Sequence, residues 1–419
     1  MPIVATIRNR PGRAGQRTLV VGAGGGVGSA LLALLERHAL GRRLLEGCSE
    51  LLLLDRDPPH GQLPARLAEK ARWLEPRAIT QASELDALLR EHPVDEVIEL
   101  AALGTWDCVQ VCAEHGASYL NTCYDHWDSE PALPSMVRAR ELFEPPDIEA
   151  GVHLIGAGMN PGLVNLLVGE GLRELAKRTG QAASLRALDI HAIVFTELDT
   201  TRERGREDLD EFAASWRPEH CLEELLEPEA MIVVDGELVG LGHPPHRAKY
   251  SARCGDRSIL GHMVPHEELV TLSAMYPGVE LGYVYELPEL AMHKLAERPE
   301  RSASEWPLRR LYPPHAMALE GLDRIGVLLC SREYGELWIG WQGAVEDALA
   351  LGTNATLLQV ATGLVAGWSS LRELDPGVYL AEELEGARVL GLAGKVLGEL
   401  EVVWDREVRV VSLRDRRVG

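Results

Sequence analysis

The segment RTLVVGAGGGVGSALLALLE, residues 17–36, constrains the fold more than any other part of the chain. A short apolar run is followed at once by glycines and then by apolar residues at helical spacing. This order predicts a buried strand, a tight turn and a helix. Glycines let the backbone approach a pyrophosphate closely, and the start of the helix offers free N–H groups and a positive dipole end. The segment therefore predicts a dinucleotide-binding turn, and the alternative is a tight turn without a ligand.

The glycines of this turn follow a G-x-x-G-x-x-G spacing, and Val27 stands where G-x-G-x-x-G would place its third glycine. The residues that we expect to bind the cofactor here are Gly22, Gly25, Gly26, Val27 and Gly28. The next apolar run, SELLLLDRD, predicts a second strand that ends in Asp55. A carboxylate there accepts hydrogen bonds from ribose hydroxyls and repels a 2′-phosphate, which favours NAD. Arg56 could instead meet a 2′-phosphate, so NADP is the less favoured cofactor.

Strand and helix patterns alternate along the chain to about residue 170. This alternation predicts an α/β fold with a Rossmann-like, doubly wound parallel sheet. Shorter strand candidates follow, among them LRALDIHAIVF, MIVVDGELVGL, LVTLSAMY and RIGVLLCS. They predict a second, α+β domain with a mostly antiparallel sheet.

Three parts of the chain follow from these patterns. We expect an NAD-binding Rossmann domain at 1–165 and an α+β domain for substrate binding at 166–350. A C-terminal helix and tail at 351–419 would pack back on the first domain. The segment TNATLLQVATGLVAGWSSL predicts one long apolar helix with Thr353 or Asn354 as its N-cap.

Composition excludes several classes of protein. The formal net charge of −22 argues against nucleic-acid binding, and it would attract cationic ligands, although solubility alone also explains it.

Seven scattered cysteines without a CxxC pair predict free thiols in a reducing compartment. The N-terminus lacks the apolar core of a signal peptide, and no apolar run approaches the roughly 20 residues of a membrane span. We therefore expect a cytoplasmic protein with no membrane partner.

A metal site is not expected. Cys108 and Cys112 are four residues apart in a helical pattern, which is typical of two core thiols. His262 and His266 have the same spacing, but a proline between them predicts a loop or a strand.

A second strand–turn–helix pattern, GAGMNPGLVNLL, spans residues 156–167. Pro161 suits the first helical position and Asn160 the N-cap, which would be a sufficient structural explanation. The turn also lies where the predicted sheet ends and the second domain begins, a usual place for a small-molecule site. The alternative is therefore that Asn160 contacts a substrate. Because Pro161 lacks an N–H donor, we do not expect a second dinucleotide site.

Two further positions have both a functional and a structural interpretation. Asp125 follows the predicted strand in LNTCYDHW, where it could contact the nicotinamide end or a substrate amine, or could serve as a turn or N-cap residue. Trp216 lies among acidic residues, which are Glu197, Asp199, Asp210, Glu211, Glu223 and Glu224. An aromatic ring beside carboxylates can hold an ammonium ion, and the alternative is a solvated charged face.

Ordered motifs along almost the whole chain resemble the saccharopine dehydrogenase-like superfamily. The motifs are YLNTCYDHW, GAGMNPGLVNLL, FTELDT, FAASW, VPHEELVTL, LEGLDRIGVLLCS, WIGW and TNATLLQVATGLVAG. Within that superfamily the chain most resembles the bacterial homospermidine synthase family. The resemblance implies a homodimer with a permanently held NAD. It implies oxidation of a primary amine of putrescine to an imine, release of ammonia, formation of a Schiff base with a second amine, and reduction of that Schiff base to homospermidine.

The resemblance also implies roles for individual residues. Asn160 would lie in the substrate pocket, Glu197 would bind an ammonium, Trp216 would supply the cation–π face and Glu224 would hold the distal amine. Asp125 stands where the family more often has a glutamate, so its carboxylate is one methylene shorter.

His266 and Glu267 match a His-Gly-Glu-like segment that has lost its glycine. A hydride can leave only from a neutral amine, so the reactive end needs a base, and His266 or a bound water is the candidate. The charged end would stay anchored by carboxylates and an aromatic ring.

Two other functions stay open on the sequence. A saccharopine or carboxypolyamine dehydrogenase-type reductase would join an amine to an aldehyde or a keto acid with NAD(P)H. It would need arginines for a substrate carboxylate, and Arg202, Arg204 and Arg206 could supply them. The third possibility is a non-catalytic NAD-binding regulatory or scaffold protein.

Overall fold

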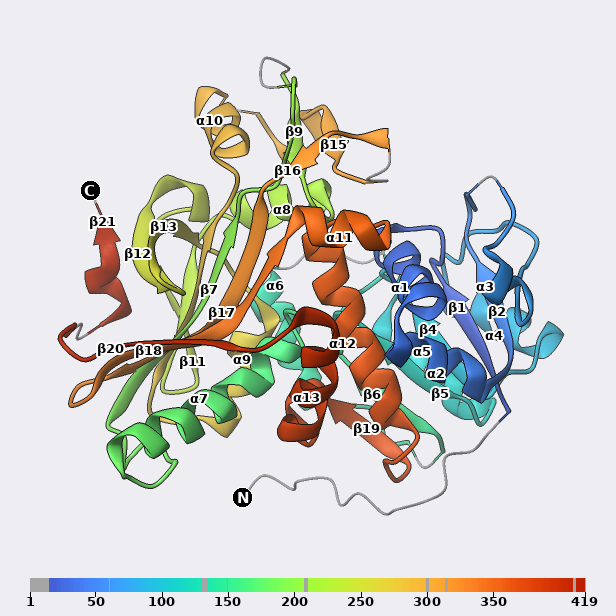
Figure 1. Ribbon diagram of the computed structural model, residues 1–419, viewed down its shortest axis with the longest axis horizontal. Helices are drawn as coiled ribbons and strands as arrows, with labels where there is room; N and C mark the ends of the chain where they lie inside the picture. The colour runs from blue at the N-terminus through green and yellow to red at the C-terminus, as the bar shows by residue number, and fades with distance from the viewer. Residues whose placement is uncertain are drawn as a thin grey trace. The chain divides into compact units, whose positions relative to one another are not determined.

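The computed structural model of the chain forms two compact units, each assembled from segments that are distant in sequence (Figure 1). The first unit comprises Met1–Ala132, Glu141–Leu163 and Leu357–Val396, and the second comprises Leu133–Arg140, Val164–Thr356 and Leu397–Gly419. The structure describes residues 15–59, 61–127, 129, 134–148, 150–206, 210–298, 301–312, 316–409 and 412–418. The start of the chain, where no signal peptide was expected, lies outside the described residues as far as residue 14.

The first unit contains a seven-stranded sheet in which every pairing is parallel. The strand order is β19-β6-β5-β4-β1-β2-β3, so the six N-terminal strands have the 3-2-1-4-5-6 order of a doubly wound dinucleotide-binding sheet. The strands are β1 (Gln16–Val21), β2 (Cys48–Leu54), β3 (Ala71–Trp73), β4 (Glu96–Glu99), β5 (Ser118–Asn121), β6 (Val152–Ile155) and β19 (Gly377–Leu380). The predicted fold class is confirmed.

The helices of this unit follow the strands in the predicted alternation. They are α1 (Gly26–Arg37), α2 (Ala39–Gly47), α3 (Ala65–Ala68), α4 (Ala82–Glu91), α5 (Thr105–Glu114) and α13 (Gly386–Leu397), together with most of α12 (Ala355–Leu371). Two α1 leucines, Leu31 and Leu35, are fully buried, as their helical spacing predicted.

The long apolar helix α12 packs closely on the end of β6. A Cβ on Gly363 would lie 1.9 Å from the carbonyl oxygen of Gly158, and one on Gly367 would lie 2.8 Å from the Cβ of Ala157. Only glycine allows the helix backbone to come this near. The C-terminal part of the chain then adds β19 to the sheet beside β6, a strand that the sequence pattern did not predict.

A buried ion pair ties α12 to the sheet within the first unit. The guanidinium of Arg372 donates to both carboxylate oxygens of Glu96, through Nε at 2.8 Å and Nη2 at 3.0 Å. Thr18 and Trp368 also donate to Glu96, at 2.9 and 2.8 Å. The Glu96 side chain is 5% exposed, so these donors replace the water that its charge would otherwise bind.

The second unit is built on a ten-stranded mixed sheet with the order β20-β18-β17-β7-β14-β13-β12-β21 and a β10–β11 hairpin attached to β14. β7 and β14 are parallel, and the other described pairings of this sheet are antiparallel. Its strands are β7 (Ile190–Asp199), β10 (Met231–Val234), β11 (Glu237–Gly240), β12 (Lys249–Cys254), β13 (Arg257–Met263), β14 (Glu280–Glu286), β17 (Leu322–Ser331), β18 (Gly335–Ala344), β20 (Glu401–Asp405) and β21 (Arg417–Val418).

Helices and two small sheets complete this unit. The helices are α6 (Ser135–Arg138), α7 (Leu163–Thr179), α8 (Pro218–Leu225), α9 (Glu267–Met275), α10 (Glu289–Glu297) and α11 (Val345–Leu351). The small sheets pair β9 (Phe212–Ala214) with β15 (Leu308–Arg310) and β8 (Arg202–Glu203) with β16 (Leu319–Glu320). Residues 397–419 belong to this unit, where β20 and β21 join the large sheet.

Two local predictions from the sequence were wrong. The segment LVTLSAMY is not a strand, because residues 269–275 belong to α9. A short apolar run fits a buried helix as well as a buried strand, and six successive residues of α9 are buried. Asn160 and Pro161 do not cap α7, which begins at Leu163. Gly162 has a φ of +137°, which interrupts any helix that would start at Pro161.

Among the described residues, no single helix is long and apolar enough to cross a membrane. Only the bent pair α11–α12 has the length and composition when both helices are taken together.

The Glu96–Arg372 pair allows a test of the first unit's stability. Replacing Arg372 by Ala leaves a buried carboxylate without its cation, so we expect the free energy of unfolding to fall by about 3 kcal/mol. Arg90→Ala breaks an exposed pair with Asp86 and should cost less than about 1 kcal/mol. Urea unfolding followed by circular dichroism measures both changes. Equal losses in the two variants would contradict the importance of the buried pair.

Candidate active site

The first glycine turn lies between β1 and α1 and is held to the end of β2. The N–H groups of Gly22 and Ala23 donate to the carbonyl of Leu54 at 2.9 and 3.1 Å. Gly22 has a φ of +80°, and a Cβ on Gly28 would lie 2.5 Å from the Gly22 carbonyl oxygen. The backbone therefore makes a tight cradle that side chains would fill, at the start of a helix whose N-cap, Gly25, has no capping side chain. This cradle fits a pyrophosphate.

Asp55 directly follows β2 and contacts the same turn. Its Oδ2 accepts the N–H of Gly24 at 2.8 Å, and its Oδ1 accepts the N–H of Asp57 at 3.0 Å. A carboxylate has about four acceptor positions, so Asp55 keeps capacity for ribose hydroxyls. Arg56 has a 71% exposed side chain 3.4 Å from Asp57.

Of the other predicted turn residues, Gly26 has a packing role. A Cβ there would lie 2.9 Å from Leu357 of α12. Val27 is half-buried beside it.

In the second glycine turn the glycines allow close packing of the backbone. Gly158 accepts the N–H of Leu163 at 3.1 Å, and a Cβ on Gly162 would lie 2.1 Å from the Gly158 carbonyl oxygen. Together with the contact between Gly158 and Gly363 of α12, this makes the turn a packing point. Asn160 lies in this turn and is half-buried.

A buried hydrogen-bond network connects the ends of β4 and β5 with the start of α5. Glu99 accepts from the Tyr119 hydroxyl at 3.1 Å and from the N–H of Ala101. Asn121 donates to Tyr119 and to Thr105, at 3.2 and 3.3 Å. The network fixes the carboxyl ends of neighbouring parallel strands, which is the edge where ligands of such sheets bind.

Asp125 is attached to the same network through its backbone. Its N–H donates to the Thr105 hydroxyl at 3.0 Å, and its carbonyl accepts the N–H of Thr105 at 2.9 Å. Its Oδ1 accepts the N–H of His126 at 2.9 Å. The half-buried Asp125 thus has a turn role, and one oxygen of its carboxylate is used locally.

The second unit gathers its acidic residues on one face of the central strands. All ten residues of β7 are buried, including Glu197 and Asp199. These two lie two residues apart and so share a face of the sheet. Tyr283 of β14 donates its hydroxyl to Glu197, and Asp323 of β17 lies directly opposite Asp199.

Burial controls the protonation of this face. Burial raises the pKa of Glu197 to about 8, with the Tyr283 hydrogen bond opposing and Asp199 adding to the shift. Burial also raises the pKa of Asp199 and that of Asp323. These carboxyls therefore hold protons at neutral pH more readily than ordinary acids.

His266 is the N-cap residue of α9 and lies within a group of carboxylates. Its Nδ1 is hydrogen-bonded to Glu268, and its Nε2 lies 4.0 Å from Glu224. Burial alone would lower the pKa of His266, but the carboxylates, first Glu268 and then Glu224, raise it to about 10. The raised pKa favours the charged imidazolium, and the role of His266 as the base stays a prediction.

Trp216 and Glu224 are linked through His220. The ring of Trp216 lies 5.4 Å from that of His220, whose Nε2 is 3.2 Å from Glu224. The side chain of Glu224 is 7% exposed, whereas that of its neighbour Glu223 is 67% exposed. The structure thus groups Glu197, Trp216, Glu224 and His266 in the second unit. Asp125 and Asn160 lie in the first.

Some residues of this site were not singled out from the sequence. Glu268, Tyr283 and Asp323 lie in apolar strand or helix patterns, where one polar residue gives a weak signal. Glu268 is fully buried, and among the described residues its Oε1 has no hydrogen-bond partner. Asp323 stands in LEGLDRIG beside Glu320 and Arg324, so no local pattern distinguished it from an ordinary charged residue.

Other charged residues of the sequence prediction are used in local pairs. Arg202 and Arg204 both bind Glu320, and Arg206 binds Glu211. The arginines considered for a substrate carboxylate therefore already have carboxylate partners.

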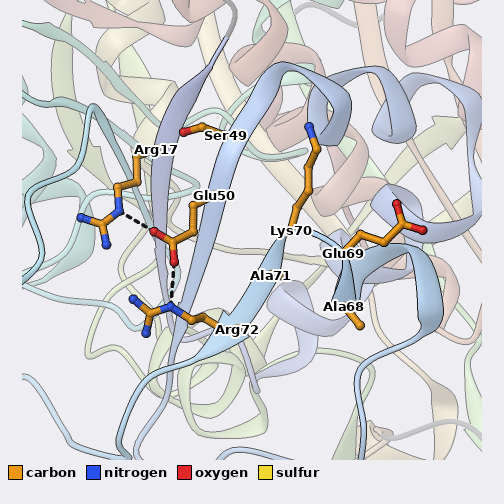
Figure 2. A pocket seen from close by; sticks show the side chains of 8 residues that line it. All are labelled: Arg17, Ser49, Glu50, Ala68, Glu69, Lys70, Ala71 and Arg72. Carbon is orange, nitrogen blue, oxygen red and sulfur yellow. Dashed lines mark hydrogen bonds and ion pairs between the residues drawn. The ribbon is translucent and has the colours of Figure 1, made fainter.

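Figure 2 shows an open pocket at the amino ends of β1, β2 and β3. Its two arginines, Arg17 and Arg72, both donate to Glu50, at 2.6 and 2.7 Å, and Lys70 donates to backbone carbonyls. The pocket lies at the sheet edge opposite the glycine turn, while ligands of this fold bind at the carboxyl ends. It is not part of the candidate site.

Comparison with known proteins agrees with this architecture. Residues 18–144 match the family model of the saccharopine dehydrogenase NADP binding domain. The chain is 23% identical to the homospermidine synthase of Mesorhizobium japonicum over 352 residues, which cover 71% of this chain and 72% of that protein. The predicted resemblance to saccharopine dehydrogenase-like proteins, and to homospermidine synthase among them, is confirmed.

Two solved structures share the fold. One is the homospermidine synthase of Legionella pneumophila in complex with NAD, with a TM-score of 0.80 and 19% identity over 96% of this chain and 98% of that one. The other is the apo saccharopine dehydrogenase (L-Glu forming) of Saccharomyces cerevisiae, with a TM-score of 0.56 and 11% identity over 93% of this chain and 100% of that one. The two-unit architecture is therefore that of these enzymes.

The buried Glu99 carboxyl makes the stability of the first unit depend on pH. Burial raises the pKa of Glu99 to about 7, although hydrogen bonds from Ala101 and Tyr119 oppose the shift. The folded state then binds more protons than the unfolded one between about pH 4.5 and 7, so stability falls as the pH rises through that window.

Glu99→Gln stays neutral and should remove this loss. At pH 8 we expect the free energy of unfolding of Glu99→Gln to exceed that of the native protein by roughly 1–3 kcal/mol, as measured by urea unfolding. At pH 4.5 the two free energies should be nearly equal. Glu69→Gln, at an exposed position, is the control. A pH-independent effect of Glu99→Gln would count against the shifted titration.

Proposed function

We propose that this chain is an NAD-dependent polyamine synthase of the homospermidine synthase type, an aminoalkyl transferase and oxidoreductase that acts on putrescine or a similar diamine. The observation that carries the proposal is the group of buried carboxylates in the second unit. Within the described part of the chain, Glu268 Oε1 is buried there without a hydrogen-bond partner. A buried oxygen without a hydrogen-bond partner is costly, and an ammonium group is a donor that can satisfy it.

The residues of the second unit divide the work of holding a diamine. Glu197 and Glu224 would bind ammonium groups through charge-assisted hydrogen bonds, and Trp216 would contribute its ring face. His266 lowers the net negative charge of the group and, as a donor, orients Glu268. A carboxylic substrate would meet repulsion here, which favours a diamine over the keto acid of a reductase.

The first unit would hold NAD at the glycine turn. The N–H groups at the start of α1 suit the pyrophosphate, and Asp55 suits the ribose hydroxyls, which favours NAD over NADP. NAD supplies hydride acceptance and return. Asp125 and Asn160 would contact the substrate or the nicotinamide end from the carboxyl edges of β5 and β6. The Legionella pneumophila relative with NAD bound supports this assignment.

The reaction requires a neutral amine at the reacting end and a charged amine at the far end. Removing the proton from one ammonium allows the hydride to leave from its neighbouring carbon and gives an imine. A second amine then displaces ammonia, and the returning hydride gives the secondary amine. We further propose a homodimer in the cytoplasm. All seven cysteines are free thiols, which favours a reducing compartment.

The direct test is product formation. Incubation of the protein with putrescine and NAD should give homospermidine and ammonia without net NADH, as followed by mass spectrometry. Trp216→Ala removes a cation–π contact of about 1–2 kcal/mol and should raise KM about 5- to 30-fold. Trp216→Phe keeps a ring and should lose less, and Trp404→Phe on β20 is the matched control. If no diamine yields a new polyamine, the proposal fails. Stoichiometric consumption of NADH with a keto acid would support the reductase.

Diamine binding should also release a proton through Glu197. With a pKa of about 8, the free Glu197 carboxyl is mainly protonated at pH 7. An ammonium ion favours the carboxylate and lowers this pKa, so binding expels a proton and affinity rises with pH up to about 8.

Calorimetry in phosphate and in Tris buffer measures this release, because the two buffers differ in ionisation enthalpy. Glu197→Gln should reduce it by about one proton and weaken binding. Glu223→Gln, at the exposed neighbour of Glu224, should behave like the native protein. Unchanged release in Glu197→Gln would exclude Glu197 as the source.

A further inference from the structure

Two buried carboxyls in the second unit lie opposite each other on neighbouring strands. Asp199 of β7 and Asp323 of β17 are direct cross-strand partners, and both are at most 1% exposed. Like charges at such positions destabilise a sheet, and burial adds to the cost of ionising both. The fold must therefore lower the charge of this pair.

Two hydroxyl groups bridge the pair. Ser215, which follows β9, has its Oγ 2.7 Å from Asp199 Oδ2. Thr356, in the first turn of α12, has its Oγ1 2.9 Å from Ser215 Oγ and 2.6 Å from Asp323 Oδ2. The four groups form the unbroken chain Asp199–Ser215–Thr356–Asp323, here named the hydroxyl bridge, and all lie in the second unit.

The number of hydrogen bonds in the hydroxyl bridge fixes the number of protons that it holds. Three hydrogen bonds require three protons, and the two hydroxyls supply only two. The third proton must reside on one of the two carboxyls. There are two arrangements, in which either Asp323 or Asp199 is the acid and all three hydrogen bonds point away from it. They differ in energy, because Asp199 Oδ1 also accepts the N–H of Thr201 at 2.7 Å. A shift of three protons converts one arrangement into the other. Three O–H bonds break, three form, and the negative charge moves from one carboxyl to the other.

Further observations agree with a shared proton. Burial raises the pKa of both carboxyls. Among the described residues, titratable groups whose charge acts on the pair include Glu197 of β7, Tyr283 and Tyr285 of β14, Cys221 of α8 and Cys254 of β12. None of these five side chains is a cation, and a shared proton reduces the repulsion between the two carboxyls.

The bridge adjoins the proposed amine site. Glu197 lies two residues before Asp199 on the same face of β7. Tyr283, which donates to Glu197, is also influenced by the charge of Glu268, whose buried Oε1 is without a partner among the described residues. Glu268 is thus linked to Glu197 through Tyr283, on the side of the bridge where the amine is proposed to bind.

We infer that the Asp199–Ser215–Thr356–Asp323 bridge is a proton relay that stores the proton lost by the substrate ammonium and returns it to the product amine. This inference rests on the proposed function. The ionised carboxyl of the bridge takes up one proton before the hydride leaves and gives it back when the secondary amine has formed, so the cycle is balanced. Ser215 and Thr356 act through the two carboxyls and are positioning residues.

Kinetics of hydroxyl variants test the relay. Ser215→Ala and Thr356→Val should lower kcat about 10- to 100-fold, with KM for the diamine changed less than about 2-fold. Thr356→Ser keeps the hydroxyl and should restore most of kcat. Thr353→Val, at a buried threonine outside the bridge, is the matched control. In mixtures of H2O and D2O, the native rate should depend on the deuterium fraction in a curved way, because several protons move. The Thr356→Val rate should depend on it linearly.

Infrared spectroscopy of the full chain tests the shared proton without any substrate. The native protein at pH 7 should show the C=O band of a protonated carboxyl that either Asp199→Asn or Asp323→Asn abolishes, and the double variant should remove no more. Glu197→Gln identifies the separate band of Glu197.

The outcomes distinguish the two proposals. Separate, additive bands, or no band from either aspartate, would overturn the relay. Native kcat and a native isotope profile in folded Ser215→Ala and Thr356→Val would overturn it as well. If the native protein makes no polyamine while the shared band is present, the proposed function fails and the shared proton stands, without the role as a relay.

Discussion

The arrangement of the central strands of the second unit is governed by the free-energy cost of burying carboxyl groups. β7 and β17 pair along almost their whole lengths, and Asp199 and Asp323 are brought face to face by that register. A shift of one residue would turn these acids toward the apolar core on the other face, so the register is strongly fixed. The hydroxyls of Ser215 and Thr356 and the donor Tyr283 satisfy the acids where they lie. The apolar core is on one side of the strands and the buried acids are on the other.

In the first unit the main constraint is the close approach of backbone segments, which glycines make possible. The first glycine turn leaves room for a phosphate, whereas Gly158 and Gly363 leave room for a helix. The two glycine-rich turns therefore have different roles. They are distinguished by the atoms that a Cβ would meet, which belong to the turn itself at Gly28 and to the second glycine turn at Gly363. The buried Glu96–Arg372 pair then ties that helix to the sheet. A long apolar helix without this pair would have few polar contacts to specify its position.

Much of the fold was predictable because local patterns agreed with the final structure. The first strand, turn and helix, the Asp55 position and the long helix beginning after Asn354 were all correct. The α9 segment was not, because a short buried helix and a buried strand have the same apolar pattern. Of the candidate site, Glu197 and Glu224 were singled out, but Asp323 and Glu268 were not. Their partners come from segments far away in the sequence, so no local spacing reveals them.

The sequence by itself determined the class of this protein: a Rossmann-like sheet with a glycine turn, a second α+β unit and an acidic composition. These follow from periodicity, glycine positions and residue types, which are local properties. Only the tertiary structure decided which acids meet and that carboxylates surround His266 and raise its pKa. The reason is physical, since the pKa of a buried group depends on its solvent exposure and on charges brought close by folding.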